Sequence, residues 1–183
     1  MEFHEAVQTR CSVRKYDPRP VPRDVLDRII EAVRRAPSWA NVQATRFVIV
    51  TDETIKAALA ATLTPGNPSR EAVRTAPVVV GICFIRERSG FYKEKAITTL
   101  GEWGLFDAGL AAANLTLAAA AEGLGTVHVA AIDLDKAADV LKLPFHVQMV
   151  ELIPLGYPAT PRSKTTRLES QKVFFREEYR GTE

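Results

Sequence analysis

Two arginines and a serine near the start of the chain have the residue types and the spacing of an anion-binding site. Arg10, Ser12 and Arg14 alternate with Cys11 and Val13. If this segment is extended, the alternation of a strand sends the three polar side chains to one side. There the guanidinium groups can hold a phosphate through paired, charge-assisted hydrogen bonds. The alternative is an ordinary solvated surface turn, which also favours these residue types.

A second polar segment, residues 36–43, is also a candidate for ligand binding. Asn41 and Gln43 each carry an amide with donor and acceptor atoms, as recognition of a heteroaromatic imide ring or a ribityl hydroxyl requires. The alternative is that Ser38 and Asn41 only cap the local backbone. Residue types alone do not separate these two interpretations.

Two further segments could complete such a site. Gly123 and Gly125 would let the backbone approach a flat ligand closely, and the small residues Ala130 and Ala131 leave space for one. The alternative is a helix end followed by a strand. Residues 161–167 form a second cationic cluster, which could meet the first around one phosphate or remain a solvated tail.

The composition is that of an ordinary globular protein. With 183 residues, of which 46% are hydrophobic and 25% charged, we expect one domain spanning 1–183. The net charge of +2 includes no long basic run, so neither a nucleic acid nor an anionic membrane is an expected partner. His4, His128 and His146 lack metal-ligand spacing, and no metal site is expected. Residues 1–5 are too polar for a signal peptide, which predicts a cytoplasmic protein.

The two cysteines lie in different surroundings. Cys83 falls within the apolar run 78–85 and is predicted to be a buried core residue. Cys11 lies between Arg10 and Arg14, where positive charge favours a reactive thiolate. Because neither cysteine belongs to a Cys-x-x-Cys pair, a thiol-dependent enzyme is only an alternative hypothesis.

Hydrophobic periodicity predicts helices and strands that alternate along the chain. The stretch 105–124 carries Asp107, Asn114 and Glu122, so we expect a helix enclosed nearly all round by protein and not a membrane span. The polar tail 159–183 contains enough apolar side chains to need a packing partner, such as a second subunit. The expected helices are 23–35, 53–63, 70–75, 97–122 and 136–143, the expected strands 46–51, 77–85, 126–132 and 147–155, and residues 86–95 an expected mobile loop.

On pattern alone, this alternation favours a parallel, doubly wound sheet. The Gly-x-Gly-x-x-Gly turn that commonly follows the first strand of such a sheet is absent from the sequence. The candidate anion-binding residues also lie outside any strand-to-helix turn. The parallel interpretation and the motifs therefore disagree.

Taken together, the motifs resemble those of the FMN-dependent nitroreductase family, from about Phe3 to Phe175. Four motifs occur in the order that the family has them. They are Arg-x-Ser-x-Arg at 10–14, Pro-Ser-x-x-Asn-x-Gln at 37–43, Gly-Leu-Gly-Thr at 123–126, and Gly-Tyr-Pro at 156–158 followed by Lys164 and Arg167.

The resemblance implies a role for each matching residue in holding FMN. The phosphate and ribityl end would lie against Arg10, Ser12, Arg14, Lys164 and Arg167. The flavin would contact Pro37, Ser38, Asn41 and Gln43, in part from the opposite subunit, and the match of Asn67 implies a place near the pyrimidine ring. A backbone amide of Ala130 or Ala131 would face flavin N5, where the family commonly has an acidic residue followed by glycine.

The fold that the resemblance implies is α+β, a three-layer nitroreductase-like arrangement with a mainly antiparallel central sheet flanked by helices. It replaces the parallel interpretation. The implied assembly is an intertwined homodimer with two FMN sites at its interface. In it, the arm 159–183 packs on the partner subunit and adds a strand to its sheet.

The implied activity is an oxidoreductase in which NAD(P)H passes a hydride to flavin N5 and an electron-poor acceptor then takes its place, a ping-pong sequence. Nitroaromatics, quinones or flavins are the expected acceptors, and no catalytic side chain is expected. Other reactions occur on this scaffold, including dehalogenation and flavin fragmentation, and a flavin-binding redox sensor or accessory subunit is a further alternative. The aromatic residues that could shape a substrate pocket are Trp39, Phe91, Tyr92 and Trp103, and the alternative for each is packing in the core or in a loop.

Overall fold

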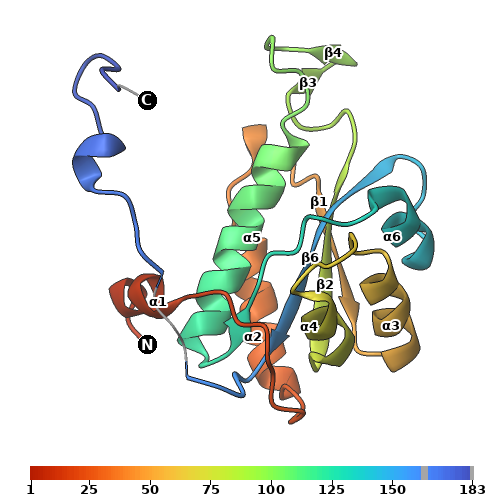
Figure 1. Ribbon diagram of the computed structural model, residues 1–183. Helices are drawn as coiled ribbons and strands as arrows, with labels where there is room; N and C mark the ends of the chain where they lie inside the picture. Colours follow the sequence, from red (N-terminus) through yellow and green to blue (C-terminus); the bar gives the residue numbers. More distant parts are fainter. Residues whose placement is uncertain (162–164, 182–183) are drawn as a thin grey trace.

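A four-stranded antiparallel sheet forms the centre of the computed structural model, which describes residues 1–161 and 165–181 (Figure 1). The strand order is β1-β2-β6-β5, and a separate hairpin holds β3 and β4. The strands are β1 (Thr45–Val50), β2 (Val78–Ile85), β3 (Phe91–Tyr92), β4 (Lys95–Ala96), β5 (Gly125–Thr126) and β6 (Val147–Gly156). The helices are α1 (Phe3–Thr9), α2 (Arg23–Arg34), α3 (Glu53–Ala61), α4 (Arg70–Thr75), α5 (Gly104–Ala121) and α6 (Leu134–Val140), with short 3-10 turns η1 (Trp39–Asn41) and η2 (Ser170–Lys172).

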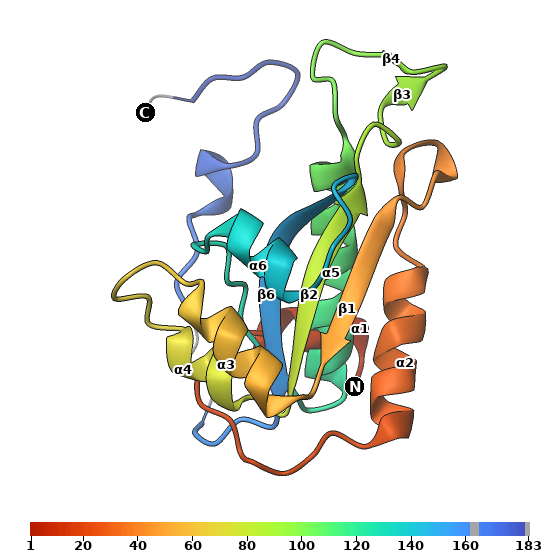
Figure 2. The same cartoon turned by 90° about the vertical axis from the view of Figure 1, so that its right-hand side faces the viewer.

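Helices cover both faces of the sheet. Figure 2 shows α3, α4 and α6 in front of the sheet and α5 behind it. Successive side chains of β2 point to opposite faces of the sheet, and each face has its own hydrophobic core. Val80 and Ile82 pack with α2 and α5, whereas Val79 and Cys83 pack with α3, α4 and α6. This double burial explains why β2 is apolar at every position. The prediction of a buried Cys83 is confirmed, and burial raises the pKa of its thiol to about 12.

The α+β fold class is confirmed, and the parallel sheet suggested by pattern alone is wrong. Every ladder in the four-stranded sheet is antiparallel. The helices α3 and α4 both lie between β1 and β2 in the sequence, yet these two strands are antiparallel neighbours. An alternation of helices and strands records the order of elements and not the direction in which each strand runs.

Most expected elements are present, often with shifted ends. Asp52 and Asp133 cap α3 and α6, because their carboxylates accept hydrogen bonds from the backbone N–H groups of Ile55 and Lys136. The prediction of a loop at 86–95 is wrong in part, since β3 and the first residue of β4 lie within this range. The strand expected at 126–132 is also shorter than predicted: beyond β5 it makes only isolated bridges at Val129 and Ile132.

Helix α5 departs from the prediction in its start and in its surroundings. It begins at Gly104 and not at Ile97, because Gly101 has a left-handed backbone (φ +69°). It is not enclosed on all sides, since Leu105 and Phe106 are 62% and 57% exposed. By length and composition α5 could span a membrane, but half of it is buried inside the fold, as in the core helix of many globular proteins.

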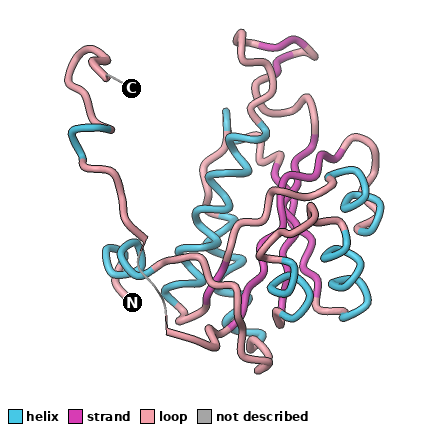
Figure 3. The backbone as a smooth tube through the Cα atoms, viewed as in Figure 1, coloured by secondary structure: helices cyan, strands magenta, loops and turns pink. Residues whose placement is uncertain are grey.

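The C-terminal arm stands away from the rest of the chain. Figure 3 shows the described residues of the arm as loop and the short turn η2, and Figure 1 shows this part extending beyond α1. Its apolar side chains are exposed, including Leu168, Val173 and Phe174. Packing on its own subunit therefore stabilises the arm only a little.

A buried carboxylate ties two loops to the start of α5. Asp107 is 1% exposed, and its oxygens accept hydrogen bonds from the Ser89 hydroxyl at 2.6 Å and the Trp39 backbone N–H at 3.0 Å. Ser89 belongs to the segment that leads to the β3-β4 hairpin, and Trp39 to the loop 37–43. Asp107 therefore fixes the loop that the sequence assigns to ligand binding.

We expect Asp107→Leu to lower the free energy of unfolding by about 2 to 4 kcal/mol, because two buried donors lose their acceptor. Asp107→Asn is the matched control: its amide oxygen can still accept from the Trp39 N–H, and it should cost clearly less. Urea denaturation measures both variants. Equal losses in the two variants would contradict this role for the carboxylate.

Candidate functional site

The segment that opens the candidate site is extended, as the sequence analysis assumed. Cys11 and Val13 are buried, whereas Ser12 and Arg14 are exposed. The Val13 N–H donates to the Thr126 carbonyl at 2.9 Å, and Ser12 forms an isolated bridge with Thr126. The alternation therefore sends the polar side chains outward, and Cys11 points inward. A buried thiol at 7% exposure does not suit the alternative of an accessible catalytic Cys11.

Tyr16 anchors the other end of this segment. Its hydroxyl donates toward the carbonyls of Val13, at 2.7 Å, and Pro154, at 3.1 Å. Burial raises the pKa of the Tyr16 phenol, against a smaller opposing effect of the Arg14 charge, so the phenol keeps its proton. The segment is thus fixed to β5 by its backbone and to β6 by a side chain.

The two glycines of the turn after α5 have structural roles. Gly123 has a left-handed backbone (φ +79°), which ends the helix. Gly125 packs on Val13, and a Cβ atom at Gly125 would lie 2.5 Å from a Val13 methyl carbon. We expected these glycines to leave room for a flat ligand. In the structure, Gly125 instead leaves room for Val13 of the Arg10–Tyr16 segment.

Arginines from the two ends of the chain meet in one cavity. Arg10 follows α1, and Arg167 lies in the C-terminal arm, yet both line a cavity of about 440 Å³ beside α5. The predicted meeting of two distant cationic segments is therefore present within a single subunit. Lys164, the other predicted phosphate ligand of the tail, lies outside the described residues. The remaining lining residues are Val7, Gly109, Ala113, Thr116, Leu117 and His128.

Arg14 lies in a different part of the site. Its Nε donates to the Ser69 hydroxyl at 3.3 Å, and the Ser69 N–H donates to the Asn67 side-chain oxygen at 2.9 Å. The Asn67 amide nitrogen then donates to the Ala131 carbonyl at 3.2 Å. These contacts bring together Arg14, Asn67 and Ala131. The three residues come from separate parts of the sequence, and the family resemblance assigned all of them to one ligand.

The backbone at Ala130 and Ala131 is presented to solvent with its donors free. Both residues are exposed. The Ala131 carbonyl accepts hydrogen bonds from the Thr64 N–H at 3.1 Å, the Thr64 hydroxyl at 3.2 Å and Asn67. Within the described residues, neither the Ala130 N–H nor the Ala131 N–H donates a hydrogen bond. This segment can therefore offer a backbone donor to a ligand.

The site arginines keep their charge available. Arg10, Arg14 and Arg167 form no ion pair with any carboxylate of the described chain, whereas surface arginines such as Arg28 and Arg74 do. A cation without a carboxylate partner is free to bind an external anion. The described residues also include no cluster of three or more histidine, cysteine or acidic side chains that could hold a metal ion.

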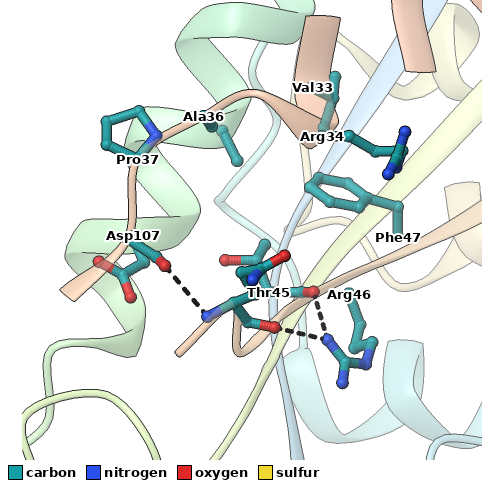
Figure 4. A pocket seen from close by; sticks show the side chains of 11 residues that line it. Val33, Arg34, Ala36, Pro37, Thr45, Arg46, Phe47 and Asp107 are labelled. Atoms are coloured by element: carbon teal, nitrogen blue, oxygen red, sulfur yellow. Dashed lines mark hydrogen bonds between the residues drawn. The ribbon is translucent and has the colours of Figure 1, made fainter. Parts of the chain in front are cut away.

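The loop 37–43 lines a separate pocket of about 210 Å³ (Figure 4). In Figure 4, Pro37 and Asp107 lie on one side of the pocket, and Arg46 and Phe47 lie on the other. The Ser38 hydroxyl accepts from the Gln43 N–H at 3.0 Å, so Ser38 caps local backbone, as the alternative interpretation held.

Backbone strain in the same loop points to a function. Ala40, Asn41 and Gln43 all have left-handed φ angles between 43° and 55°. Such conformations are costly for residues other than glycine and are concentrated at functional sites. The Asn41 side chain is exposed, as ligand binding requires.

The loop pocket and the arginine cavity lie on different sides of α5. Asp107 and Ala111 line the loop pocket, whereas Gly109 and Ala113 line the cavity of Arg10 and Arg167. Positions two residues apart on a helix point in nearly opposite directions. One subunit therefore does not bring the loop 37–43 and the arginines to the same ligand.

The four aromatic residues predicted for a substrate pocket gather near the start of α5 and the hairpin, and none lines the arginine cavity. Trp103 precedes α5, donates from its ring nitrogen to the Thr98 hydroxyl at 3.0 Å and stacks edge-on against Phe106. Phe91 and Tyr92 form β3, and Tyr92 is exposed. Trp39 lies in η1, beside the loop pocket.

His128 lines the arginine cavity, although no sequence motif pointed to it. Its Nδ1 lies 3.0 Å from both carboxylate oxygens of Glu151. The sequence signal was a single histidine without metal spacing, two residues before Ala130. Glu151 is 23 positions away in the chain, so no local pattern links the two residues.

Comparisons with known proteins find relatives in sequence and in fold. The NAD(P)H FMN reductase of Bacillus subtilis is 33% identical over 97% of this chain and 74% of its own length. A nitroreductase family protein of Clostridium novyi superposes with a TM-score of 0.78 at 32% identity, over 90% of this chain and 89% of that one. The NADPH:FMN oxidoreductase of Vibrio harveyi, complexed with NAD+, superposes with a TM-score of 0.84 at 25% identity, over 99% and 79%.

The family model of the nitroreductases matches residues 7–157, which span the Arg10–Tyr16 segment, the loop 37–43, the sheet and α5. The shared sequence and the shared fold together place this chain in the nitroreductase family.

Proposed function

We propose that this protein is an FMN-dependent oxidoreductase that uses NAD(P)H to reduce electron-poor small molecules such as nitroaromatics, quinones or flavins. The observation that carries the proposal is the cavity in which Arg10 and Arg167 meet, neither of them paired with a carboxylate of the described residues. The names of the relatives support the cofactor and the donor, since they include an FMN reductase and an NADPH:FMN oxidoreductase.

The residues present suit a ligand that is anionic at one end and aromatic at the other. Arg10 and Arg167 would hold the phosphate in their shared cavity, whose volume is in the usual range for a cofactor site. Ser12, exposed on the same extended segment, can donate its hydroxyl to the phosphate or ribityl end. Arg14, Asn67 and the free N–H groups at Ala130 and Ala131 would lie along the ring.

When bound, FMN would accept a hydride from NAD(P)H and pass the electrons to an acceptor that uses the same site in turn. The chain would orient the ring through Asn67 and the exposed backbone of Ala130 and Ala131. The charge of Arg14 would favour added negative charge on the ligand. No protein side chain is assigned a covalent role.

A homodimer would complete this site, and three features support it. The face of α5 that carries Leu105 and Phe106 is apolar and exposed. The arm carries exposed apolar side chains, among them Phe174. The outer edge of β1 pairs with no other strand of the described chain, and Ile49 and Phe47 line an apolar groove beside it.

In that dimer, the arm 159–183 of one subunit would lie along β1 of the other and add a strand to its sheet. The loop 37–43, which one subunit cannot bring to its own arginine cavity, would then reach the FMN of the partner. Trp39 and Tyr92 would border the acceptor. Residues 1–183 would form one domain in each subunit, with the arm as its exchanged part.

We expect the double variant Arg10→Ala/Arg14→Ala to purify without the yellow colour of flavin, because each charged hydrogen bond lost costs roughly 1.5 to 3 kcal/mol. The matched control is Arg23→Ala/Arg74→Ala, which removes two exposed arginines that pair with carboxylates. Flavin absorbance per mole of protein is the measurement. Full flavin content in the Arg10/Arg14 variant would refute the assignment.

Turnover separates an oxidoreductase from a protein that only binds flavin. In an anaerobic titration with NADH or NADPH, we expect the visible flavin absorbance to bleach and to return when a nitroaromatic or a quinone is added. An absorbance that neither nucleotide changes would instead indicate a redox-inactive binding protein. The Arg10→Ala/Arg14→Ala variant, mixed with the same concentration of free FMN, serves as the control for reaction of unbound flavin.

The arm can be tested without removing its arginine. We expect Phe174→Asp/Phe175→Asp to yield monomers that lose FMN, because a charge replaces each apolar contact with the partner. The control Phe145→Asp changes an aromatic residue that is 91% exposed outside the arm and α5, and it should stay dimeric. Sedimentation velocity measures the mass, and a dimeric arm variant would overturn this role of the arm.

A further inference from the structure

The interaction between His128 and Glu151 is unusual for its burial. The Glu151 side chain is only 11% exposed, and His128 is its one hydrogen-bond partner within the described residues. A buried carboxylate is costly unless a donor satisfies it. The Nδ1–H of His128 fills that need, since it lies 3.0 Å from each carboxylate oxygen.

This contact leaves the other ring nitrogen free. Because Nδ1 donates to Glu151, Nε2 is the atom available to a ligand. The His128 side chain is 46% exposed, and it lines the same cavity as Arg10 and Arg167. In an imidazolium ring both nitrogens carry a proton, so Nε2 can then donate to an anion while Nδ1 donates to Glu151.

Within the described part of the chain, no acidic residue lines the cavity. Arg10 comes from the end of α1, Arg167 from the arm, and Thr116 and Leu117 from α5. Among the described residues that line the cavity, the charged groups beside His128 are therefore two arginines, and Glu151 contacts its Nδ1. An anion between the arginines would be exposed to a third donor held at a fixed orientation.

We infer that His128 is a phosphate ligand of FMN and that Glu151 is the residue that positions it. This inference rests on the proposed function and deepens it by adding a donor from the strand side of the cavity to the arginines of α1 and the arm. It assigns the selectivity for FMN over riboflavin, which lacks the phosphate, in part to His128. Neither residue belongs to the motifs that carry the family resemblance.

The test compares FMN and riboflavin binding to the apoprotein of the full chain by quenching of flavin fluorescence. His128→Asn is the key variant, because the Asn amide nitrogen takes the place of Nδ1 and still donates to Glu151, while Nε2 is lost. We expect the dissociation constant for FMN to rise about tenfold or more and that for riboflavin to change less than about twofold. The unfolding temperature of the apoprotein should stay unchanged.

His146→Asn is the matched control, since His146 is exposed and stacks on Phe145 outside the cavity. It should leave both dissociation constants unchanged. A His128→Asn variant that binds FMN as tightly as the natural chain, or that loses affinity for FMN and riboflavin equally, overturns the inference while the proposed function stands. A natural chain that binds no FMN overturns both.

The positioning role of Glu151 has its own variants, which also serve if His128→Asn fails to fold. Glu151→Leu removes the acceptor for Nδ1, and we expect it to weaken FMN binding about tenfold with little effect on riboflavin. Glu151→Gln keeps an acceptor oxygen and should remain closer to the natural chain. A residue that only supported the fold would weaken both ligands alike, and that result contradicts the role of Glu151.

Discussion

The site depends on one close contact between distant segments of the chain. The Arg10–Tyr16 segment lies against β5 through the hydrogen bond from Val13 to Thr126, and only a glycine at position 125 leaves room for Val13. This contact sets the register that turns Ser12 and Arg14 outward and Cys11 and Val13 inward. If the segment slipped by one residue, the buried and exposed sets would exchange. The polar residues are thus positioned by apolar packing.

From this contact the site extends in two directions. Toward α1 and the arm, Arg10 and Arg167 provide positive charge that no carboxylate in the described part of the chain neutralises. Toward the loop 64–69, the hydrogen bonds of Arg14, Ser69 and Asn67 lead to the Ala131 carbonyl. Two arginines therefore lie together at one end, and at the other end Arg14 is hydrogen-bonded to Ser69 beside backbone and amide groups. This polarity is what an elongated ligand with one anionic end requires.

The sequence predicted the local elements well where a single cause determines them. The helix 70–75 follows from short-range hydrogen bonds and periodicity, and it is present with the predicted bounds. Strand direction was wrong on pattern alone, because it depends on how connections cross the sheet. The start of α5 was missed because a left-handed Gly101 outweighs the helix propensity around it. His128 was missed because its partner, Glu151, is reached only through the fold.

The placement of Arg167 on an arm with little packing of its own has a thermodynamic consequence. In the proposed dimer, the energy that orders the arm comes from the partner, so cofactor binding and subunit association become linked equilibria. Dilution that favours monomers would release the flavin, and saturating flavin would hold the dimer together at lower protein concentration. The fraction of subunits that hold FMN would then rise with the concentration of the protein.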